Sequence, residues 1–116
     1  MKDNARSVLI IDDHPIVREG LAELINRETD LQVCGQAASG SEALSLTEAL
    51  QPDLALVDIS LDDISGLQLI KNLKTRRRQL RVLVLSMHDE SLYAERALRA
   101  GAHGYVMKRE APTHVI

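Results

Sequence analysis

Four short apolar segments each end in a side chain that can carry charge or donate a hydrogen bond. The run "SVLII" is followed by Asp12 and Asp13, "DLALV" by Asp58, "RVLVL" by Ser86 and "GYVM" by Lys108. If the runs are parallel strands, their carboxyl ends meet at one edge of a sheet. Open α/β sheets bind ligands at that edge. The sequence therefore predicts a polar site built from these five side chains.

The chemistry of such a site follows from its side-chain types. Three carboxylates brought together repel one another, and a divalent cation relieves the repulsion. Ligands that are all oxygen favour Mg²⁺ over Zn²⁺. Lys108 and Ser86 would supply a second cation and a hydroxyl donor for phosphoryl oxygens, as phosphoryl transfer requires. A carboxylate can itself accept the phosphoryl group, and Asp58, alone at the end of a central strand, is the best-placed acceptor.

The elements that must position these residues alternate along the chain. Continuous apolar runs at 7–11, 53–57, 81–85 and 104–107 are typical of strands buried on both faces, as in a parallel sheet. The segment "LQVCGQA" at 31–37 alternates with polar residues and indicates an edge strand.

Helical patterns lie between the runs. Pro15 is placed to open the first helix, Gly40 or Ser41 the second, and Gly101 to end the fourth. The expected inward residues are Val17, Leu21, Leu24 and Ile25; Ala43, Thr47 and Leu50; Leu69, Ile70 and Leu73; and Ala94, Ala97 and Leu98. Strand and helix in strict alternation predict βαβ units and a doubly wound, three-layer α/β fold.

Length and composition limit the function classes. A chain of 116 residues is the size of one domain. The net charge of −3 and the presence of only two aromatic residues, Tyr93 and Tyr105, argue against a direct nucleic-acid surface. Cys34 is the only cysteine, which excludes an intrachain disulfide and a multi-cysteine metal site. No apolar stretch approaches transmembrane length, so we expect no membrane association and a cytoplasmic protein.

Four segments carry a family resemblance that covers nearly the whole chain. "LIIDDHPIVREGL", "ALVDISLDDISGLQLI", "VLVLSMHDE" and "ALRAGAHGYVMK" resemble, in order and spacing, the receiver domain of two-component response regulators. "DDHPIVREGL" and "SMHDE" are most similar to the NarL/FixJ subgroup, which carries a C-terminal LuxR-type helix-turn-helix. The resemblance implies a flavodoxin-like parallel sheet of five strands in the order 2-1-3-4-5.

The resemblance also implies roles for individual residues. Asp58 would take a phosphoryl group from a phosphohistidine on a sensor histidine kinase or a phosphotransfer protein. Mg²⁺ would be held by Asp12, Asp13, Asp58 and the backbone carbonyl of Ser60.

Other positions would read out or tune the phosphorylated state. Lys108 would pair with the phosphoryl group, Ser86 would move toward it, and Tyr105 would rotate inward behind Ser86. Ser60 and His88 lie where the family tunes the rate of dephosphorylation. The family usually has proline four residues after the acceptor, where this chain has Asp62.

The resemblance places residues 1–116 in one receiver domain within a longer protein. The last six residues, "APTHVI", are typical of the first turn of a fifth helix, so we expect that helix to be mostly missing. Homodimerisation on activation is implied, with DNA bound only through a C-terminal domain. The domain would be a signalling module that catalyses only its own phosphorylation and dephosphorylation.

Several alternatives compete with this interpretation. Asp12 and Asp13 could instead cap the helix at Pro15. The basic run "KTRRRQLR" at 74–81 could bind nucleic acid, but at a helix end it is more typical of a solvated face. An aspartyl-phosphate phosphohydrolase would require a second aspartate at the position that Ser60 occupies. A phosphate-independent interaction module would require none of the five side chains of the predicted polar site. The four histidines show no metal-ligand spacing and are interpreted as structural or surface residues.

Overall fold

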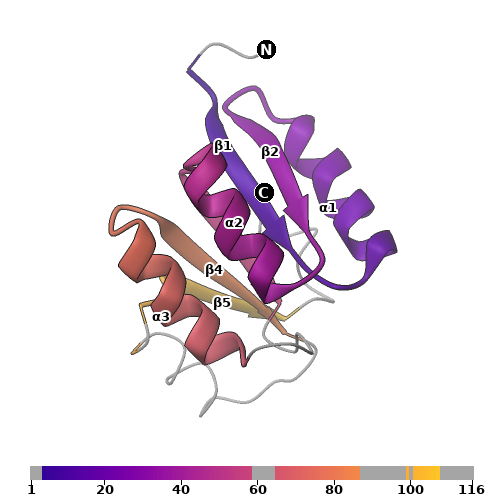
Figure 1. The fold of residues 1–116 in the computed structure, drawn as a ribbon. Helices are drawn as coiled ribbons and strands as arrows, with labels where there is room; N and C mark the ends of the chain where they lie inside the picture. Colours follow the sequence, from indigo (N-terminus) through magenta and orange to yellow (C-terminus); the bar gives the residue numbers. More distant parts are fainter. Residues whose placement is uncertain (1–3, 59–64, 87–98, 100, 108–116) are drawn as a thin grey trace.

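The protein folds around a five-stranded parallel sheet (Figure 1). The computed structural model describes residues 4–58, 65–86, 99 and 101–107. Its strand order is β2-β1-β3-β4-β5, as predicted. The elements in chain order are β1 (Arg6–Ile11), α1 (Pro15–Asn26), β2 (Leu31–Ala37), α2 (Gly40–Leu50), β3 (Leu54–Asp58), α3 (Gly66–Arg76), β4 (Arg81–Ser86) and β5 (Gly104–Met107).

Helices cover both faces of the sheet, which explains the continuous apolar runs. On β1, Leu9 and Ile11 belong to the core cluster beneath α2 and α3. Val8 and Ile10 face the other way and share a second core cluster with the buried residues of α1. Figure 1 shows α2 and α3 together on one side of the sheet. The predicted three-layer arrangement and the edge position of β2 are confirmed.

Local signals fix where the helices begin. Pro15 is the first residue of α1, where its missing N–H costs nothing. The Ser39 hydroxyl accepts a hydrogen bond from the Glu42 N–H, so α2 begins at Gly40, one of the two predicted starts. Ser65 caps α3 in the same way through the Gln68 N–H. In α2 and α3 the capping hydroxyl thus pairs with one of the N–H groups that the start of a helix leaves without a partner.

One inward position was predicted wrongly. Leu50 was expected to be buried with Ala43 and Thr47, but 41% of its surface is exposed. Leu50 is the last residue of α2, and its Cδ1 lies only 2.8 Å from where a Cβ would stand at Gly35 of the edge strand β2. Its side chain therefore packs over the rim of the sheet, where no further strand covers its outer side.

Two predicted helices fall outside the described residues. The helix predicted around Ala94, Ala97 and Leu98 lies there except for Arg99, which is helical. Gly101, predicted to end it, has a φ of +121°, a conformation that glycine adopts without strain. The start of the fifth helix also lies outside. Within the described residues, no helix combines the length and apolarity that crossing a membrane requires.

The position of Leu50 gives a matched test of the core. Leu69 is fully buried in the cluster beneath α3, so Leu69→Ala should lower the free energy of unfolding by about 2–5 kcal/mol. The same change at the half-exposed Leu50 should cost less than half as much, since solvent already contacts that side chain. Urea unfolding measures both values. Equal losses would contradict the placement of Leu50 at the rim.

Candidate functional site

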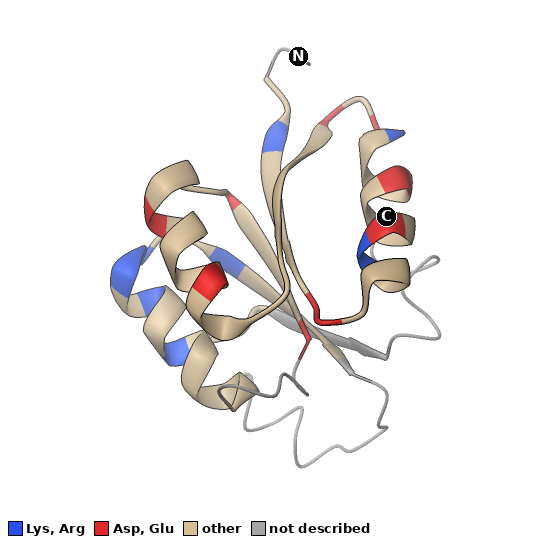
Figure 2. Cartoon of the chain, turned by 45° about the vertical axis from the view of Figure 1, so that its right-hand side comes forward, with Lys and Arg blue, Asp and Glu red and all other residues tan. Residues whose placement is uncertain are grey.

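The register of the two central strands brings two aspartates together. Strands β1 and β3 pair in parallel with Ile11 opposite Val57, so Asp12 and Asp58 follow at neighbouring positions. Both side chains are fully buried. Asp13, the next residue, is 27% exposed. Figure 2 shows the acidic segments after these strands side by side at one end of the sheet. The predicted convergence of the three carboxylates is present in the structure.

A histidine that sequence reasoning set aside completes this cluster. His14 Nδ1 lies 2.6 Å from Asp12 Oδ1, 3.0 Å from Asp13 Oδ1 and 3.7 Å from Asp58 Oδ2. At this distance the ring nitrogen and the carboxylate oxygen form a hydrogen bond, and Nδ1 is its donor when Asp12 is ionised. In that state His14 donates a hydrogen bond to the acidic cluster.

The main chain around Asp12 is held in place by two further contacts. Asp12 Oδ1 also accepts the backbone N–H of His14, at 2.9 Å, and the Arg18 guanidinium donates to the Asp12 carbonyl, at 2.7 Å. The residue at the capping position of α1 is His14, so neither aspartate occupies it. The helix-cap alternative for Asp12 and Asp13 is wrong.

The negative charge of the three carboxylates at this edge favours the binding of a cation. Two unit charges 4 Å apart repel by roughly 4 kcal/mol at an effective dielectric constant of about 20. Three carboxylates carry three negative charges, and a protonated His14 would cancel only one. One ligand atom from each of Asp12, Asp13, His14 and Asp58 lies within 4.8 Å of the others, a spacing that could hold a metal ion. The carboxylate oxygens suit Mg²⁺, which prefers oxygen ligands.

The remaining predicted residues are placed only in part. Ser86 ends β4, next to β3, and Tyr105 lies in β5 opposite Val84; only their backbone is described. Ser60, His88 and Lys108 lie outside the described residues.

Sequence reasoning missed two contributors, His14 and Arg18. The signal for His14 was its position directly after the aspartate pair, whereas the search for metal ligands considered only the spacing between histidines.

Cys34 and the basic run at 74–81 lie outside the acidic cluster and make contacts typical of structural residues. Cys34 is half-buried in β2 and packs against the core, and burial raises the pKa of its thiol, as for a cysteine that acts as a small apolar side chain. In the basic run, Lys74 Nζ donates to the carbonyls of Arg78 and Leu80, and Arg76 pairs with Glu48 at 2.6 Å. Lys74 and Arg76 of this run lie in the last turn of α3, and Figure 2 shows basic positions at that end of the helix.

The contact between His14 and Asp12 makes a testable prediction about metal binding. A cation bound to Asp12 must compete with the His14 N–H for the same carboxylate oxygen. Removing that donor in His14→Leu should strengthen Mg²⁺ binding about fivefold, the equivalent of one hydrogen bond of about 1 kcal/mol. Isothermal titration calorimetry measures the dissociation constant.

Two variants serve as controls for this experiment. His103→Leu, at the amino end of β5, should leave Mg²⁺ affinity unchanged. Asp12→Asn should weaken it strongly, because an amide carries no charge. Weaker Mg²⁺ binding in His14→Leu would show that His14 supports the cation instead of competing with it.

Comparison with known proteins identifies the family. Residues 8–116 match the model of the response regulator receiver domain. The transcriptional regulatory protein UhpA of Salmonella typhimurium is 43% identical over 110 residues, which are 95% of this chain and 55% of UhpA. This chain spans about half the length of the curated relatives it matches.

Solved structures agree with this assignment. The receiver domain of NarL from Mycobacterium tuberculosis is 33% identical, with a TM-score of 0.90, and the match covers 97% of this chain and 90% of that one. A response regulator from Burkholderia pseudomallei, solved with a phosphorylated aspartic acid, a calcium ion and citrate, is 33% identical, with a TM-score of 0.81 over 89% of this chain and 59% of that one. The predicted fold and the NarL-type resemblance are confirmed. The chain belongs to the response regulator receiver domain family, a family of signalling domains.

Proposed function

We propose that Asp58 is the phosphoacceptor of this receiver domain and that phosphorylation there switches a transcriptional output. One observation carries the proposal: two fully buried carboxylates and a third beside them converge at the carboxyl edge of the sheet in a chain of the receiver family. Asp58 alone comes from β3, while Asp12 and Asp13 share the other strand end. That separation leaves the pair to hold a cation while Asp58 reacts.

The proposed step is a transfer between two nucleophiles. A carboxylate oxygen of Asp58 attacks the phosphorus of a phosphohistidine, and the new P–O bond forms as the P–N bond breaks. The donor imidazole leaves with the electron pair of that bond. The donor would be a sensor histidine kinase or a phosphotransfer protein. In the Burkholderia relative, a phosphorylated aspartic acid has been seen.

The residues that would hold Mg²⁺ are Asp12, Asp13, Asp58 and the backbone carbonyl of Ser60. The three carboxylates fit the ion, because hard oxygen ligands and surplus negative charge are what it requires. When bound, Mg²⁺ neutralises charge on the phosphoryl oxygens and on the carboxylates. The Arg18 contact and the Asp12–His14 turn hold the Asp12 end of the cluster in position before any ion arrives.

Three further residues would read the phosphorylated state. Lys108 would pair with the phosphoryl group, and Ser86 would donate its hydroxyl to a phosphoryl oxygen. Tyr105 would rotate toward the space that Ser86 vacates. Support comes from the strand register, which sets Ser86 opposite Met107, the residue before Lys108. Ser60 and His88 would tune how long the phosphoryl group persists.

The output of this switch would lie outside the chain. UhpA is a transcriptional regulatory protein, and this chain matches 55% of its length, which supports a further domain in the full protein. The resemblance to the NarL/FixJ subgroup implies that this domain is a C-terminal helix-turn-helix. We propose that residues 1–116 form the receiver, that it dimerises on phosphorylation, and that DNA is bound only by the second domain. The exchange with the kinase would take place in the cytoplasm.

Acetyl phosphate tests the acceptor directly. With Mg²⁺, intact-mass measurement should show one added phosphoryl group on the wild type and none on Asp58→Asn, since an amide oxygen is a poor nucleophile. Chelation of Mg²⁺ with EDTA should abolish the adduct. Asp30→Asn, an exposed carboxylate in the turn before β2, is the matched control and should be phosphorylated normally.

Thermal stability distinguishes lost chemistry from lost folding. Asp58→Asn removes one of three crowded charges, so its melting temperature should equal or exceed that of the wild type. A stable wild type that gains no adduct would overturn the proposal and favour a phosphate-independent module. Continuous consumption of acetyl phosphate without an adduct would favour a phosphohydrolase.

A further inference from the structure

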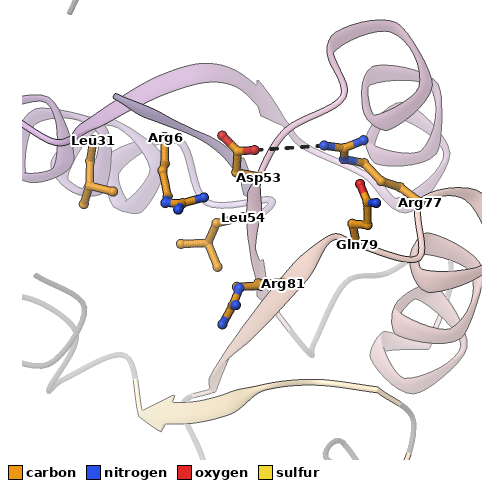
Figure 3. Close-up of a pocket in the computed structure, with 7 residues that line it drawn as sticks. All are labelled: Arg6, Leu31, Asp53, Leu54, Arg77, Gln79 and Arg81. Carbon is orange, nitrogen blue, oxygen red and sulfur yellow. Dashed lines mark ion pairs between the residues drawn. The ribbon is translucent and has the colours of Figure 1, made fainter. Parts of the chain in front are cut away.

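A second candidate site lies at the opposite end of the sheet from the acidic cluster. A pocket of about 330 Å³ opens at the amino ends of β1, β3 and β4. Figure 3 shows the residues that line it, which are Arg6, Leu31, Asp53, Leu54, Arg77, Gln79 and Arg81. Its volume is within the usual range for small-molecule sites.

The single acidic residue of the pocket is already engaged. Asp53 Oδ2 accepts hydrogen bonds from the Ser7 N–H at 2.9 Å and the Ser7 hydroxyl at 3.3 Å. Its other oxygen, Oδ1, lies 4.0 Å from the Arg77 guanidinium, and Arg77 Nε donates to the Pro52 carbonyl at 2.7 Å. The opposite charges of Asp53 and Arg77 therefore compensate each other on one wall of the pocket (Figure 3).

The other two arginines leave positive charge in the pocket. In the part of the chain that the structure describes, no hydrogen bond or ion pair is formed by the side chains of Arg6 and Arg81. Both residues are exposed, and Figure 3 shows their guanidinium groups on either side of Leu54. The register agrees, with Leu54 opposite Arg81 on one side and opposite Val8, two residues after Arg6, on the other.

We propose that this pocket binds a small organic dianion, a phosphomonoester or a dicarboxylate, between Arg6 and Arg81. Guanidinium groups present paired N–H donors that match carboxylate and phosphate oxygens. An anion held between them also relieves the repulsion of the two cations. Leu31 and Leu54 supply an apolar surface for the body of the ligand. The site is separate from Asp58 and does not depend on its phosphorylation.

The test uses two probes, phenyl phosphate and succinate, on ¹⁵N-labelled protein in EDTA at constant ionic strength. Backbone amides of Ser7, Leu54 and Arg81 should shift on titration with at least one probe. Arg6→Gln and Arg81→Gln should each raise the dissociation constant about fivefold or more, the loss of one charge-assisted contact. Arg27→Gln, which removes the same charge from the end of α1, is the matched control and should bind normally.

The outcomes separate the ligand classes and decide the proposal. A response to phenyl phosphate alone assigns a phosphomonoester site, and a response to succinate alone assigns a dicarboxylate site. The proposal is overturned if neither probe shifts these amides, or if all three arginine variants bind equally, which would indicate a general charge effect. Because EDTA removes divalent cations and Asp58 is unmodified, neither result bears on the phosphoacceptor.

Discussion

The burial of like charges at the ends of two adjacent central strands is the constraint on which this structure depends. Asp12 and Asp58 are fully buried and Asp13 is close to both. A repulsion of several kcal/mol is comparable with the total stability of a small domain, about 5–15 kcal/mol. The sheet can hold the carboxylates only because β1 and β3 are packed on both faces by aliphatic side chains. The core therefore keeps in place a cluster that would otherwise separate.

Most of the fold could be predicted because its signals are local. The apolar runs marked the strands within one residue at each end, and Pro15 marked the start of α1. Leu50 was predicted wrongly because helical periodicity says which face a residue is on, but not where the sheet beneath that face ends. The sheet ends where its edge strand lies, and this depends on how the strands are arranged in the fold, which the periodicity of one helix does not show.

The carboxylates of the site could also be predicted from the sequence, because local signals mark the strand ends. Parallel strands place their carboxyl ends together, so the residues after each strand indicated which carboxylates would share an edge. The side chain of His14 turns back onto three carboxylates, which depends on the turn between β1 and α1. The residue types in this turn do not fix its geometry, so the contact between His14 and the carboxylates could not be predicted from the sequence.

The connection between β1 and α1 is short, and every one of its residues belongs to the acidic cluster. It contains only three positions, which hold a buried carboxylate, a second carboxylate, and the histidine that precedes the first helical residue. One inserted residue would either withdraw a carboxylate from the cluster or turn α1 by about 100° about its axis, which would move Leu21 and Ile25 off the sheet. The length of this loop thus couples the site to the packing of a whole layer, and variation in loop length should be confined to other connections of the fold.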